Sequence, residues 1–184
     1  MSTVFIAVTF DTGIVGRMQF EPVKPVFTLS PASAKGEGYV LSEDKMFWSR
    51  EITDDYVNRT IARTKWHPDD GTPVSWRRVA ATDFPVQHHE FRRAWRDSGG
   101  TSIGVDMPKA RDIWRERMRA ARAPLLKALD VEMTRALRDP VKQDEIEAKR
   151  QALRDMTSDP AIEAAQTPAA LKLIWPAVLT ETPA

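Results

Sequence analysis

Apolar residues recur at steps of three and four over a long stretch of the second half of the chain. The series runs from Met107 through Trp114 and Met118 to Ala136 or Leu137. Steps of this size place the residues on one face of an α-helix, because the helix has about 3.6 residues per turn. The stripe therefore predicts a long amphipathic helix that must bury one narrow face.

Capping residues and prolines set the expected limits of this helix. Asp106 is a candidate N-cap, and Pro108 lies near the first turn, where a missing backbone N–H costs little. Pro124 falls inside the stripe. Because an interior proline removes a hydrogen bond and clashes with the preceding turn, we expect a kink or a break there. Asp139-Pro140 ends the stripe, and a second helix over residues 141–156 completes a predicted helical hairpin.

The two arms of this hairpin carry opposite charge. Residues 109–127 contain seven basic side chains and two acids, whereas residues 130–163 contain nine acids and six bases. A basic stripe is typical of a nucleic-acid-binding helix. An antiparallel hairpin, however, sets the basic arm beside the acidic one, so we favour a mutually complementary pair of arms. The contacts expected for the nucleic-acid alternative are Arg111, Arg115, Arg119 and Arg122.

The first half of the chain has β character. Residues 4–10 are dense in β-branched and aromatic side chains, Asp11-Thr12-Gly13 supplies a turn, and residues 14–21 resume as a second strand. Thr53 is placed to cap a helix whose first turn contains two acids. Further strands are expected over residues 26–29, 39–41, 45–49 and 74–79.

The composition changes near Pro85, which marks the expected domain boundary. We predict an α+β chain with an N-terminal antiparallel β-rich domain containing one helix, residues 1–86, and a C-terminal helical domain, residues 87–184. The second domain is expected to begin with a short helix over residues 88–96 and a short strand over residues 101–105. It is expected to end with a short terminal helix that Thr167-Pro168 opens.

The residues that usually carry chemistry do not form a recognisable set. The chain has no cysteine, which excludes disulfides, thiolate metal ligands and a cysteine nucleophile. His88-His89-Glu90 is the most metal-like cluster, but neighbouring residues of a helix point about 100° apart and cannot grip one ion from one face. The acid pairs Asp54-Asp55 and Asp69-Asp70 fit solvated structural roles. We therefore expect a protein that is not an enzyme and that binds no metal and no cofactor.

The charge balance restricts the classes of partner. Lys and Arg total 27 against 26 Asp and Glu, giving a formal net charge of +1, so the chain has no global attraction for nucleic acid. No run approaches the ~18 apolar residues of a membrane span, and no membrane insertion is expected. Nucleic acid is accordingly not the expected partner.

Residues 91–95 and 106–114 begin a series of matching segments in the second half of the chain. Through these segments the sequence from Phe91 onward resembles a family of small prophage-encoded proteins of the tail region. The ending, residues 150–155 followed by Trp175-Pro176, is also similar to the C-terminus of phage tail-fibre assembly chaperones. The N-terminal β half departs from those chaperones, which leaves room for a virion component. The first resemblance covers about half of the chain and is carried by residues 91–95, 106–114, 119–124, 128–132, 151–155, 159–162, 171–172 and 175–176.

The resemblance implies a non-enzymatic phage tail-associated protein, either a minor tail or fibre component or a tail-fibre assembly factor. It implies other tail or fibre proteins as partners, a second copy of this chain as a further candidate, and a location in the virion tail or the host cytoplasm. The alternative is a nucleic-acid-binding or host-regulating phage protein that uses the basic helix 109–127. Large apolar side chains are the usual anchors of protein interfaces. The candidate partner-binding residues are Phe91, Trp95, Trp114, Met118 and Trp175.

Overall fold

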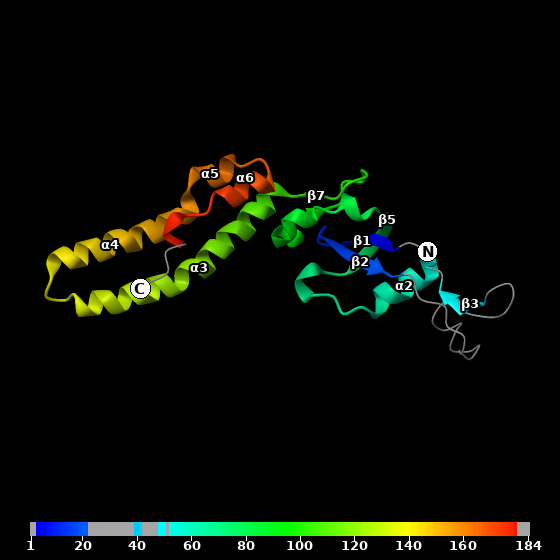
Figure 1. Ribbon diagram of the computed structural model, residues 1–184, viewed down its shortest axis with the longest axis horizontal. Coiled ribbons are helices and arrows are strands. Elements are labelled where there is room, and N and C mark those ends of the chain that lie inside the picture. Colours follow the sequence, from blue (N-terminus) through cyan, green and yellow to red (C-terminus); the bar gives the residue numbers. More distant parts are fainter. Residues whose placement is uncertain (1–2, 22–38, 42–47, 51, 180–184) are drawn as a thin grey trace. The chain divides into compact units, whose positions relative to one another are not determined.

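The computed structural model describes residues 3–21, 39–41, 48–50 and 52–179 (Figure 1). The chain forms two compact units, Met1–Gly104 and Val105–Ala184. The first contains an antiparallel sheet and the second is helical, so the predicted α+β class is confirmed. The predicted boundary after residue 86 lies earlier in the chain than this division, and residues 87–104 belong to the first unit.

A three-stranded antiparallel sheet forms the centre of the first unit. Its strand order is β2-β1-β5, with β1 (Val4–Phe10) between β2 (Val15–Phe20) and β5 (Pro73–Val79). The predicted turn at Asp11-Thr12-Gly13 joins β1 to β2, and Gly13 has the positive φ, 75°, that a tight turn favours. The strands predicted over residues 4–10, 14–21 and 74–79 are therefore present.

The core of the first unit lies between this sheet and one helix. Ile6, Val8 and Phe10 alternate along β1 and are fully or almost fully buried on one face. Val57 and Ile61 of α2 (Asp54–Arg63) are four residues apart, which puts them on one side of the helix, and they belong to the same core. The Thr53 hydroxyl caps α2 as predicted, accepting a hydrogen bond from the Tyr56 N–H at 3.2 Å.

A second small sheet pairs β3 (Tyr39–Leu41) with β4 (Trp48–Arg50) in antiparallel register. The predicted strand over residues 45–49 is present in its last two residues, whereas residues 45–47 lie outside the described part of the chain. The strand expected over residues 26–29 also lies outside it. The short 3-10 segments of this unit are η1 (Pro68–Asp70), η2 (Ala81–Asp83) and η3 (Val86–Ala94).

The prediction of a short α-helix over residues 88–96 is wrong. η3 consists of 3-10 turns, in which His88 and Phe91 have non-helical backbone angles. The next two residues form strand β6 (Trp95–Arg96), which pairs with β7 (Gly104–Val105). Gly99, with a φ of 80°, lies in the loop between these strands. Pairing with β7 therefore satisfies the backbone of residues 95–96 in place of a helical turn.

An ion pair fixes this loop to the main sheet. The Arg77 guanidinium of β5 donates to both carboxylate oxygens of Asp97, at 2.6 and 3.1 Å, and also reaches the Thr101 carbonyl oxygen at 3.4 Å. Asp97 in turn accepts from the Gly99 N–H at 2.9 Å. The hydrogen bond from Arg77 lowers the pKa of the Asp97 carboxyl below its ordinary value.

The second unit begins with the long helix that the apolar stripe predicted. α3 (Met107–Arg135) has 29 residues and continues through Pro124 without the break that was one of the two expected outcomes. α4 (Pro140–Asp155) runs antiparallel to it, since Arg150 pairs with Asp130 whereas Arg122 reaches Leu153. The green and yellow helices of Figure 1 show this hairpin. The later segments are η4 (Met156–Ser158), α5 (Pro160–Ala164), α6 (Pro168–Leu173) and η5 (Ala177–Leu179).

Each α-helix of this unit begins with the same local device. An Asp or Thr side-chain oxygen accepts a hydrogen bond from an N–H of the first turn, and a proline occupies one of the first two helical positions. Asp139-Pro140, predicted to end the apolar stripe, also starts the helix that follows it, and Asp159-Pro160 starts α5 in the same way. The four capping residues are Asp106, Asp139, Asp159 and Thr167.

Gly71 provides a test of the first unit. Its backbone angles, φ 91° and ψ −157°, belong to a region that only glycine adopts readily, and a Cβ would collide with the Asp11 carboxylate. We expect Gly71→Ala to lower the free energy of unfolding by about 2 kcal/mol. Gly100→Ala is the matched control, because no atom lies within 4 Å of its Cβ position. Urea unfolding followed by tryptophan fluorescence measures both, and equal midpoints would contradict the strain.

Candidate functional site

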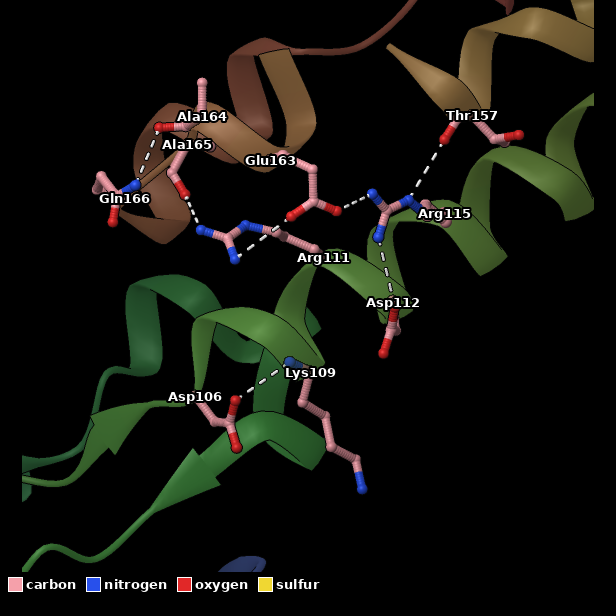
Figure 2. Close-up of polar contacts among 10 residues, drawn as sticks. All are labelled: Asp106, Lys109, Arg111, Asp112, Arg115, Thr157, Glu163, Ala164, Ala165 and Gln166. Atoms are coloured by element: carbon pink, nitrogen blue, oxygen red, sulfur yellow. Dashed lines mark hydrogen bonds and ion pairs between the residues drawn. The ribbon is translucent and has the colours of Figure 1, made fainter. Parts of the chain in front are cut away.

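One face of α3 carries side chains that reach the later segments of the helical unit. Arg111, Arg115 and Arg122 are four and seven residues apart, so they share a face of the helix. Arg111 and Arg115 point toward α5 and the turn before it (Figure 2). All three donate hydrogen bonds to backbone carbonyl oxygens.

The acceptors lie where the later helical segments end. The Arg111 Nη2 donates to the carbonyl oxygen of Ala165, the C-cap of α5, at 2.8 Å. The Arg115 Nε donates to the Thr157 carbonyl oxygen in η4 at 3.3 Å. The Arg122 Nη1 donates to the carbonyl oxygens of residues 153 and 154 in the last turn of α4, at 3.0 and 3.1 Å.

Trp114 makes the corresponding contact with α6. Its Nε1 donates to the carbonyl oxygen of Ile174, the C-cap of that helix, at 3.0 Å. Its ring meets the Trp175 ring edge-on, with 5.1 Å between the centroids and 67° between the planes. This is a favoured aromatic geometry. Trp114 therefore fixes the last helix through a polar and an apolar contact together.

These contacts have a common electrostatic cause. The last carbonyl groups of a helix have no partner within the helix, and the helix dipole makes that end negative. A guanidinium supplies several donors and a positive charge at the same place. The face of α3 therefore acts as a shared cap for the C-terminal ends of α4, η4, α5 and α6.

Glu163 of α5 adds a carboxylate to this network. It forms an ion pair with Arg115 and lies 3.7 Å from the Arg111 Nη1 (Figure 2). The hydrogen bond from Arg115 is the largest cause that lowers the pKa of the Glu163 carboxyl below its ordinary value of 4.5. The charges of both arginines lower it further, against a rise from partial desolvation.

The four arginines expected to contact nucleic acid differ in whether they have partners within the helical unit. Arg111, Arg115 and Arg122 are engaged within the unit, whereas Arg119 is exposed and has no hydrogen bond or ion pair among the described residues. Asp130, the first residue of the acidic segment 130–163, lies in α3 and pairs with Arg150 of α4. The expected pairing of basic with acidic residues is present where Arg111 and Arg115 meet Glu163, and contacts to carbonyl groups add to it.

The five predicted partner-binding residues are not brought together in one unit. Phe91 and Trp95 belong to the first unit, and Trp114 and Met118 belong to the second; all four are buried. Trp175 alone among the five is partly exposed. It lines a hollow of about 380 Å³ at the end of the helical unit, together with Leu173 and Pro176.

Exposed apolar side chains of the helical unit were not singled out from the sequence. Leu137 and Val141 are each 70% exposed, and they lie on either side of Asp139-Pro140 where α3 turns into α4. Leu173, at the hollow beside Trp175, is 87% exposed. The sequence contained one signal for the exposure of Leu137. The apolar stripe could end at Ala136 or at Leu137, and the residue that the structure buries is Ala136.

Three of the four acids in the pairs Asp54-Asp55 and Asp69-Asp70 have arginine partners. Asp54 lies 2.8 Å from Arg78, Asp55 lies 2.9 Å from Arg59, and Asp69 lies 2.5 Å from Arg93. The third pairing joins η1 to η3. Over the described ranges of the chain, no group of three or more His, Asp or Glu side chains is placed to hold a metal ion.

Comparison with known proteins finds no matching family model, no matching curated sequence and no matching solved structure. None of the helices in the described residues has the length and apolar character needed to cross a membrane.

The lowered pKa of Glu163 predicts a specific response to acid and to mutation. The carboxylate stabilises the folded chain above pH 4.5, and this contribution is lost as the pH falls through the lowered pKa. We expect Arg115→Gln to raise the pKa of Glu163 toward 4.5, because the largest cause of the shift is removed. Carboxyl ¹³C NMR titration measures this value. Arg117→Gln removes an exposed arginine two residues away and should leave it unchanged; an equal pKa in both variants would contradict the assigned cause.

Proposed function

We propose that this chain is a non-enzymatic phage tail-associated protein that acts through protein–protein contacts of its helical unit. It serves as a minor tail or fibre component or as a tail-fibre assembly factor. The sequence resemblance from residue 91 onward supports the phage assignment. The observation that carries the contact role is the pair Leu137 and Val141, both 70% exposed at the α3–α4 turn.

The energetics of this pair favour an interface. Scattered exposed apolar residues are ordinary on protein surfaces, but two large ones on a single turn form a local patch. Burying a leucine or valine side chain contributes about 1.5–3 kcal/mol. The two together therefore supply a useful part of the free energy of a micromolar complex, which is about 8 kcal/mol.

The partners of this proposal are other phage tail or fibre proteins, with a second copy of the chain as a further candidate. The locations that follow are the virion tail and the host cytoplasm. A fibre component and an assembly factor differ in whether the chain remains in the finished particle. Both roles fit the proposed contacts, and the presence or absence of the chain in purified virions distinguishes them.

The nucleic-acid alternative loses most of its contacts. Three of its four arginines already donate to carbonyl groups, so binding phosphate would compete with the caps of the helical unit. Arg117 and Arg119 are the exposed arginines that remain on this part of α3. Lys127 is a further exposed cation of this helix, and so few phosphate contacts give only a shallow dependence of affinity on salt.

We predict that glutamates at the turn will disrupt the complex. Full-length tagged chain is purified from cells producing the phage that encodes it, and bound tail and fibre proteins are quantified by mass spectrometry. Leu137→Glu with Val141→Glu should lower their recovery at least fivefold, because charges replace the apolar surface. Ala120→Glu with Ala123→Glu is the control, since it adds the same charges at exposed positions of α3 away from the turn.

Two outcomes would count against the proposal. If the wild-type chain recovers no tail or fibre protein and is absent from virions, the tail assignment fails. If both glutamate pairs retain full recovery while circular dichroism shows intact helices, the contact does not lie at the α3–α4 turn. Binding to DNA or RNA that weakens steeply with salt would instead support the alternative.

A further inference from the structure

A cavity of about 700 Å³ lies in the first unit, apart from the surface proposed for tail partners. Its lining comes from β2, from the loop between α2 and β5, and from the segment η3 to β6. Residues far apart in the sequence are thus brought to one hollow. Its volume lies within the range of about 300–1,000 Å³ typical of small-molecule sites.

The lining is strongly basic. Arg17, Lys65, Arg92 and Arg93 line the cavity, and the carboxylate among the lining residues is Asp70. His67 also lines it, but its Nδ1 accepts a hydrogen bond from the Asp69 N–H at 3.3 Å. Cations gathered in a concave surface raise the local positive potential and attract anions.

Two of these cations already have partners and two are available. Arg93 pairs with Asp69 at 2.5 Å, and the Arg17 guanidinium lies over the Phe5 ring at 4.7 Å from its centroid. Lys65 and Arg92 are exposed and have no hydrogen bond or ion pair among the described residues. These two side chains are therefore the ones free to bind an anion.

The apolar wall of the cavity is held rigidly. The Trp66 Nε1 donates to the Ile61 carbonyl oxygen at 3.2 Å, and its ring meets the Phe10 ring edge-on at 5.0 Å. Gly16 permits this approach, because a Cβ there would lie 3.0 Å from Phe10 and 3.4 Å from Trp66. A fixed indole beside exposed cations suits a ligand with a planar apolar part and an anionic part.

We propose that this cavity binds a phosphorylated small molecule of nucleotide size. Lys65 and Arg92 hold its phosphate oxygens through charge-assisted hydrogen bonds, and Arg17 adds positive charge behind them. Trp66 and the buried Trp95 form the apolar side of the site. All lining residues of the site belong to the first unit, whereas the proposed tail contacts belong to the second.

Isothermal titration calorimetry of the full chain at low salt tests this site with ADP, pyrophosphate and adenosine. ADP and pyrophosphate should bind, with affinities that fall as salt is raised, and adenosine should not bind measurably. Lys65→Ala with Arg92→Ala should weaken ADP binding at least tenfold. Lys65→Arg with Arg92→Lys, which keeps both charges but changes the donor geometry, should bind ADP more tightly than the alanine pair.

The control variant is Arg117→Ala with Arg119→Ala, which removes two exposed arginines from the other unit and should leave ADP affinity within twofold. The absence of ADP binding to the wild-type chain would overturn the proposal. Equal losses in the two alanine pairs would overturn it too, because they indicate nonspecific attraction. A hexaglutamate peptide that binds more tightly than ADP, or adenosine that binds as tightly, would assign the cavity to a different ligand class.

Discussion

The second unit depends most on hydrogen bonds to the carbonyl groups at the ends of its short helical segments. α5 has five residues and α6 has six, well below the roughly 12–15 that an isolated helix needs to be marginally stable. Their ends must therefore be held from outside. α3 does this with Arg111 for α5 and with Trp114 for α6. The relation is reciprocal, because Gln143 of α4 donates to the carbonyl oxygen of Ala136, the C-cap of α3, at 2.9 Å.

This arrangement changes what a basic stripe means. Three of the four α3 arginines that look available to phosphate have acceptors inside their own unit, as Arg122 does at the end of α4. In the first unit the opposite holds, since Lys65 and Arg92 line a cavity and have no described partner. Three arginines of α3 therefore support the architecture of the helical unit, whereas two cations of the first unit line the cavity proposed to bind a ligand. The surface proposed for macromolecular partners is the exposed apolar pair Leu137 and Val141 at the turn of the hairpin.

Features set by local chemistry were predictable from the sequence. The strand over residues 4–10 and the caps at Thr53 and Asp106 follow from side chains within a few residues of each other. The structure of residues 88–96 was not predictable in this way, because Phe91 and Trp95 fit a helical face as well as a turn followed by a strand. The acceptors of the α3 donors are backbone carbonyls 31 to 60 residues away, and no residue type marks a carbonyl as unsatisfied. Convergence of basic residues on one cavity likewise depends on tertiary packing.

Hydrogen exchange at the end of α4 tests the shared cap most directly. A hydrogen bond from a charged group contributes about 1.5–3 kcal/mol, and each 1.4 kcal/mol changes an equilibrium about tenfold. Arg122→Met should therefore speed amide exchange in residues 150–156 by about tenfold or more, because the last turn of α4 loses its external donor. Arg119→Met removes an exposed arginine from the same helix and should leave that exchange unchanged. Equal exchange in the two variants would contradict the account of α3 as the cap of the later helices.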